Sequence, residues 1–135
     1  MNPIEQIKER LRKYPEVKYE ADASSIVVLP ASSDGFAVGL DVNGSQFTVS
    51  FNGWHEDFTT EEEALECFAF GLSDECRLRE HRRGNFPYRW AVESKQDGEW
   101  VTDSETGLAF FPFWRRTEVV YLRNQLIKSN DEPAT

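Results

Sequence analysis

Arginine and aromatic residues that could bind an anion gather between Cys76 and Trp90. In a strand with the sequence CRLREHRRG, alternate side chains share a face, so four basic residues would line up. Aromatic residues follow at once, and arginine beside an aromatic ring is suited to phosphate, carboxylate or a stacked base. The sequence therefore predicts a candidate ligand or partner surface made of Arg77, Arg79, His81, Arg83, Tyr88 and Trp90.

The length of the loop after Arg83 decides which face these arginines occupy. A two- or four-residue loop would place Arg79 on the same face as Trp90. A three-residue loop would set Leu78 opposite Val92 and leave the arginines on the solvent-exposed face. The sequence does not choose between these registers. A solvated strand face with local ion pairs is the simpler alternative to a binding site, since such pairs contribute only about 0–1 kcal/mol each.

A second aromatic cluster surrounds Pro112, and Arg115 and Arg116 follow it. In a strand, Phe110 and Phe111 must face opposite sides, so one of them needs a second cover. That cover could be the predicted last helix, which would make the cluster part of the core, another protein chain or a ligand. Exposed aromatic patches usually mark interfaces. We therefore take three of these residues as a candidate interface: Phe111, Phe113 and Trp114.

No recognised catalytic or metal-binding motif is present in the sequence. His55 lies beside Glu56 and Asp57, but neighbouring residues of an extended segment point to alternate faces. The spacings of zinc sites, phosphate-binding loops and nucleophile elbows are missing. Cys67 and Cys76 are too few for a disulfide framework, and we expect both to be reduced. We therefore predict no catalytic residue, no metal and no cofactor, and we lean against an enzyme.

Charge is distributed unevenly along the 135 residues, whose net charge is −9. Residues 19–76 contain twelve acidic residues and no lysine or arginine, whereas residues 77–90 contain five arginines and one glutamate. The acidic block argues against binding to nucleic acid or to an anionic membrane, and it favours a basic or neutral partner. A merely solvated acidic surface is the alternative interpretation.

The length and composition fit one globular domain over residues 1–128, followed by a polar tail over residues 129–135. Hydrophobic residues make up 39% of the chain, which is enough for a core without a disulfide or metal. No apolar run reaches the roughly 18 residues of a membrane span. The first residues are charged throughout and do not resemble a secretory signal, so we expect a cytoplasmic protein.

The clearest structural signal is a β-hairpin centred on Asn43-Gly44. Apolar residues alternate on both sides of this dipeptide, which suits a two-residue type I′ turn. Such a turn would set Leu40 opposite Phe47 and Val38 opposite Val49 on one apolar face. The other face is polar and has no basic residue. We therefore expect a sheet that is covered on one side only.

Three helices are predicted around the strands. Asn2 and Pro3 favour the start of a first helix, and Thr60 and Glu63 have the capping-box spacing that starts a second. Apolar residues at helical spacing predict a third helix over residues 113–128. Short strands separated by turns are predicted in the second half, at residues 76–83, 88–94, 100–102 and 108–111.

These elements predict an α+β domain in which an antiparallel sheet is covered mainly on one face by helices, in the order helix, strands, helix, strands, helix. In layout the chain resembles the type III secretion chaperones, which are small, acidic and dimeric. We interpret it as a non-enzymatic, chaperone- or adaptor-like protein that binds a protein partner or itself as a homodimer. One alternative is a small anionic-ligand-binding protein or enzyme with a pocket near the second-half strands. Another is an acidic inhibitor or immunity-type protein.

Overall fold

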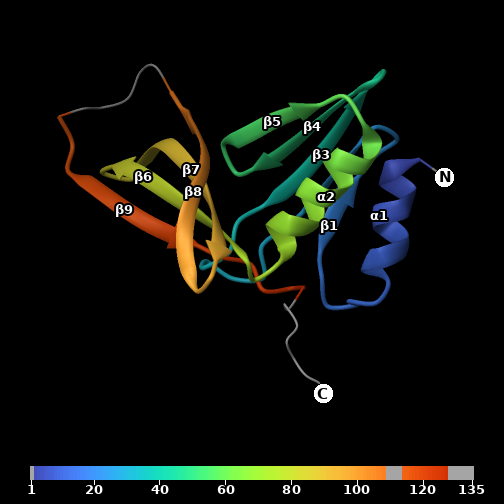
Figure 1. Cartoon of the computed structure of the whole chain (residues 1–135), viewed down its shortest axis with the longest axis horizontal. Coiled ribbons are helices and arrows are strands. Elements are labelled where there is room, and N and C mark those ends of the chain that lie inside the picture. Colours follow the sequence, from blue (N-terminus) through green and yellow to red (C-terminus); the bar gives the residue numbers. More distant parts are fainter. Residues whose placement is uncertain (1, 109–113, 128–135) are drawn as a thin grey trace.

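The structure is a computed structural model and describes residues 2–108 and 114–127. These residues form two helices and two antiparallel sheets, which lie beside each other in Figure 1. The five-stranded sheet has the order β1-β2-β3-β4-β5, and the four-stranded sheet has the order β8-β7-β6-β9. The elements are α1 (Pro3–Leu11), β1 (Tyr19–Ala21), β2 (Ser25–Val28), β3 (Val38–Asn43), β4 (Gln46–Phe51), β5 (Trp54–Phe58), α2 (Glu61–Leu72), β6 (Cys76–Arg83), β7 (Phe86–Gln96), β8 (Glu99–Gly107) and β9 (Thr117–Leu122).

Both helices begin where the capping residues predict. The Asn2 side chain accepts a hydrogen bond from the Glu5 backbone at 2.8 Å, and Thr60 Oγ1 accepts one from the Glu63 backbone at 3.2 Å. α1 and α2 lie on the same face of the five-stranded sheet (Figure 1). Each turns an apolar stripe inward, and those stripes are made of Ile4, Ile7 and Leu11 in α1 and of Ala64, Phe68 and Leu72 in α2. Neither helix has the length and apolarity needed to cross a membrane.

The β3–β4 hairpin has the predicted apolar face but a different register. Leu40 lies opposite Val49 and Val38 opposite Phe51, two residues away from the predicted pairing. The loop consists of Gly44 and Ser45, and Gly44 adopts the left-handed φ of 65° that glycine tolerates. Because the shift is an even number of residues, the same side chains still face the helices.

The two sheets share one hydrophobic core, which runs from α1 to β9. They meet where the β4–β5 turn reaches β7. A Cβ atom added to Gly53 would stand 2.4 Å from the Trp90 ring, so the close approach there requires glycine. Beside this contact, Trp54 Nε1 donates a hydrogen bond to Ser104 Oγ at 2.8 Å. These contacts join the second half of the chain to the helix-covered face of the first sheet.

The α+β prediction is wrong, because the chain is predominantly β and the described residues include only two short helices. Within the predicted third helix, residues 117–122 form strand β9, which pairs antiparallel with β6. Val119, Val120 and Tyr121 favour a strand, and pairing with β6 outweighs the helical spacing of the apolar residues. β8 is also longer than the predicted strand over residues 100–102, since it extends from Glu99 to Gly107. Residues 109–113 and the tail at 129–135 lie outside the described residues.

Candidate functional site

The β6–β7 hairpin combines a two-residue loop with a bulge. Arg83 pairs with Phe86 across Gly84 and Asn85, but the register then shifts, so that Leu78 lies opposite Val92. Tyr88 is the extra residue on β7. The bulge therefore gives most of the hairpin the register expected for a three-residue loop, although the loop itself has two residues.

This register places Arg77 and Arg79 on the face of the second sheet that is opposite the core. Arg77 Nε contacts Glu93 Oε1 at 2.7 Å, and Arg79 bonds both Glu93 Oε2 at 2.8 Å and Glu105 Oε2 at 3.0 Å. We call this the arginine face, defined by Arg77, Arg79, His81 and Arg83. Glu93 is only 3% exposed, so these arginines serve first to neutralise a buried carboxylate.

Aromatic rings flank the arginine face: Tyr88, which belongs to the predicted set, and Trp100 and Tyr121, which do not. The Arg77 guanidinium lies 4.7 Å from the Trp100 ring centroid and 4.2 Å from that of Tyr121. Tyr88 lies near the other end of the face, 6.2 Å from the His81 ring. Tyr121 was missed because residues 113–128 were predicted to form a helix, whereas they include strand β9. Trp100 lay within the predicted strand over residues 100–102 but was not assigned to this surface.

Trp90 does not belong with the arginines. It points into the core, where its Nε1 donates a hydrogen bond to Glu80 Oε1 at 2.9 Å. Glu80 is 4% exposed and also accepts from Arg82 Nε at 2.6 Å and Asn52 Nδ2 at 3.4 Å. The sequence-predicted set is therefore divided between two faces of one sheet, with Trp90 in a structural polar cluster.

The titratable groups of this region show how their surroundings change their chemistry. Burial, followed by the charges of Arg79 and Arg89, lowers the pKa of His81 below its usual 6.5, while Glu105 acts in the opposite direction. The Nδ1 atom of His81 is buried and has no hydrogen-bond partner among the described residues.

Burial raises the pKa of Cys67 to about 12 and also raises that of Cys76, so neither thiol is disposed to act as a nucleophile.

The candidate aromatic interface is described at one position only. Trp114 is 72% exposed, while Phe111 and Phe113 lie outside the described residues.

The acidic His55 segment forms strand β5, where His55 and Glu56 alternate between faces. No group of metal-ligating side chains occurs among residues 2–108 and 114–127.

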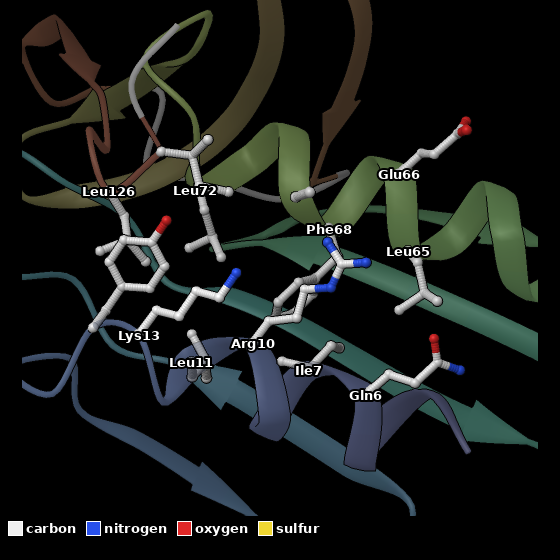
Figure 2. A pocket seen from close by; sticks show the side chains of 13 residues that line it. Gln6, Ile7, Arg10, Leu11, Lys13, Leu65, Glu66, Phe68, Leu72 and Leu126 are labelled. Atoms are coloured by element: carbon white, nitrogen blue, oxygen red, sulfur yellow. The ribbon is translucent and has the colours of Figure 1, made fainter. Parts of the chain in front are cut away.

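A different feature is a concave groove between α1 and α2 (Figure 2). Its cavity volume is about 420 Å³. Apolar side chains from both helices and from the segment after β9 line it: Ile7, Leu11, Leu65, Phe68, Leu72, Leu126 and Ile127. The backbone N–H groups of Leu126 and Ile127 each donate to Leu72 O at 3.1 Å, which holds this segment at the end of α2.

Two cations and one carboxylate lie among the polar groups around the groove. Figure 2 shows Arg10 from α1 and Lys13 from just after it reaching over the groove, whereas the Glu66 carboxylate points away from them. Both cations are exposed, and neither forms an ion pair within the described part of the chain. At the other end, Gln6 Nε2 donates a hydrogen bond to Glu61 Oε2, which joins the two helices near their N-termini.

The sequence did not indicate this groove, although it predicted α1 and α2, the two helices that form its walls. The helical spacing indicated apolar stripes that face the sheet. Leu65 has helical spacing to the buried residues Phe68 and Leu72, yet it is only half-buried and lines the groove. The groove depends on the distance between α1 and α2, which are separated by about fifty residues in the sequence. The periodicity of apolar residues within each helix does not indicate the distance between the two helices.

No protein-family model, curated protein or solved structure matches the chain. The layout that resembles the type III secretion chaperones is also not the layout found, because the predicted final helix contains strand β9. A functional assignment therefore depends on the chain's own residues, and the groove and the arginine face are the two surfaces to consider.

Proposed function

We propose that this protein is a non-enzymatic, adaptor- or chaperone-like binding protein whose α1–α2 groove receives apolar side chains of a partner protein. The observation that carries the proposal is the groove itself, with an apolar lining and cations at its rim. Its volume of about 420 Å³ lies within the range of roughly 300–1,000 Å³ typical of binding clefts.

The composition of the groove supports a role in binding a protein. Leu65, Leu126 and Ile127 are half-buried, so a partner would remove further apolar surface from water. The rim groups are charged and exposed, which is the common arrangement of an apolar centre with a polar edge. Arg10, Lys13 and Glu66 at the rim, and two cysteine thiols whose pKa values are raised by desolvation, give no support for catalysis.

Peptide selection tests this function even while the partner is unidentified. Peptides displayed on phage and enriched on the parent protein should lose binding to Leu65→Lys, which places a charge in the groove. Val101→Lys is the matched control, because Val101 is 41% exposed on β8 in the other sheet. Circular dichroism would verify that both variants are folded. Enriched peptides that bind all three proteins equally would contradict a role for the groove.

The protein is proposed to act in the cytoplasm. This placement is based on its two cysteines, which form no disulfide.

A second copy of this chain is one such partner. Light scattering over a protein dilution series would test self-association. Under a homodimer, Leu65→Lys would lower the average mass and Val101→Lys would not, whereas a constant monomer mass in the parent would exclude the homodimer.

A small anion bound at the arginine face is a second candidate function. Arg89 lies opposite His81 and forms no ion pair within the described residues, and the buried Nδ1 of His81 lacks a hydrogen-bond partner there. A phosphate would offset this excess positive charge. Inorganic phosphate should then raise the melting temperature of the parent but not of Arg89→Gln. The same rise in Arg89→Gln would contradict this second function.

A further inference from the structure

We infer that the occupant of the α1–α2 groove is an amphipathic helix of a partner protein, with carboxylates along the edge that faces Arg10 and Lys13. This inference rests on the proposed function, since it names the kind of segment that the groove would bind. It is drawn from the backbone chemistry of the groove walls, from the charges at the rim and from the composition of the chain's own tail.

The walls of the groove favour a helix over an extended strand. Its lining comes from α1 and the residues just after it, from α2 and from residues 126 and 127. The backbone groups of α1 and α2 are bonded within each helix, so they offer no row of free donors and acceptors to a strand. A helix satisfies its own backbone and needs only an apolar face, which makes it the suitable guest for a groove between helices.

The rim of the groove selects for negative charge on one edge of that guest helix. Arg10 lies in the last turn of α1, and Lys13 follows the helix, where its backbone N–H donates to Arg10 O at 3.2 Å, so the two cations follow each other along the same side of the groove (Figure 2). Other cations of this segment are already paired, Lys8 with Glu5 at 3.5 Å and Arg12 with Glu9 at 3.1 Å. Arg10 and Lys13 have no such partner among the described residues. Carboxylates one turn apart on the guest would complement both.

Two further observations limit which segment could occupy the groove. The Glu66 carboxylate points away from Arg10 and Lys13 in Figure 2, so it leaves the charge over the groove positive. The chain's own last residues, Lys-Ser-Asn-Asp-Glu-Pro-Ala-Thr, contain acidic groups but no large apolar side chain. They could supply the charge but not the apolar stripe. These residues are therefore not the occupant, and the groove calls for a partner segment with both properties.

Three synthetic peptides would test this inference. All share one helical stripe of leucines, and the edge beside that stripe carries glutamate, glutamine or lysine. Fluorescence anisotropy measures the Kd of each for the full-length protein. We expect the glutamate peptide to bind about tenfold more tightly than the glutamine peptide, as two rim ion pairs would allow. The lysine peptide should bind most weakly.

Variants at the rim should reverse this order. Arg10→Glu with Lys13→Glu should favour the lysine peptide over the glutamate peptide. Lys8→Glu with Arg12→Glu is the matched control, since it makes the same change in charge in the same segment, at residues that do not line the groove. The control should keep the parental order, which would separate rim contacts from a general effect of net charge.

The affinities of the three peptides test the charge preference, the helical occupant and the proposed function separately. Equal affinity of the parent for the three peptides, or an unchanged order in the Arg10→Glu, Lys13→Glu variant, would overturn the inference. If Leu65→Lys still abolished that equal binding, the proposed function would stand while the charge preference fell. Absence of binding by all three peptides would overturn the helical occupant, and the phage-selected peptides would then decide separately whether the groove binds proteins.

Discussion

Gly71 of α2 lies directly against the ring of Phe51 of β4. A Cβ atom added at Gly71 would stand 2.3 Å from Cε1 of Phe51, which is itself fully buried. Glycine thus allows the C-terminal end of α2 to approach the sheet closely. This contact sets the height of α2 above the sheet and so helps to position one wall of the groove.

Substitution of Gly71 should destabilise the protein. Alanine favours a helix by about 1 kcal/mol over glycine, whereas overpacking a core costs about 1–3 kcal/mol. Because the added Cβ would stand only 2.3 Å from the Phe51 ring, the cost should lie in the upper part of that range, about 2–3 kcal/mol, so Gly71→Ala should lower the free energy of unfolding by about 1–2 kcal/mol. Gly107→Ala is the control, because its Cβ would meet neighbours at 3.6 Å or more. Urea denaturation measures both variants. A Gly71→Ala protein as stable as the control would contradict the close approach.

Glu80 should be important for stability, because it accepts hydrogen bonds from Trp90 and Arg82 in the core. Glu80→Ala would leave the buried indole N–H without an acceptor and Arg82 without its counter-charge. We expect a loss of about 2–4 kcal/mol in the free energy of unfolding. Glu105→Ala removes an exposed ion pair with Arg79 and should cost less than about 1 kcal/mol. Equal losses in the two variants would argue against a structural role for Glu80.

His81 should make stability depend on pH. Its pKa is lowered in the folded protein, so the unfolded chain binds this proton more readily. The free energy of unfolding should therefore decrease as the pH falls below about 6.5 and level off below the folded-state pKa of His81. The decrease should be smaller in His81→Gln, whereas His55→Gln, at an exposed site on β5, should behave like the parent. Denaturant titrations across this range measure the slope, and equal slopes in all three proteins would contradict the assignment.

The sequence was informative where the signal is local. The caps at Asn2 and Thr60 marked both helix starts, because side-chain bonds to nearby backbone groups depend on a few adjacent residues. The alternation around Gly44 identified the hairpin and its buried face. The register of that hairpin was wrong by two residues, since the positive φ lies at Gly44 alone and the turn is therefore Gly44-Ser45.

Features that depend on distant pairing were missed. Residues 117–122 have apolar groups at both helical and strand-like positions, and only the partner strand β6 decides between them. The bulge at Tyr88 fixed which face carries the arginines, and neither the loop length nor the alternation indicated it. The candidate residue Trp90 was consequently assigned to the wrong side of its sheet. The groove joins α1 to α2 and to residues 126 and 127, which no local pattern connects.

Methyl nuclear magnetic resonance offers the most direct test of binding in the groove. A protein labelled at its leucine methyl groups would be titrated with the glutamate-edged peptide. Binding in the groove predicts intermolecular contacts and large shift changes at Leu11, Leu65 and Leu126, with Leu29 and Leu78 little affected. Shift changes confined to leucines outside the groove, or no contacts at Leu65 when the peptide is saturating, would contradict the proposed binding site.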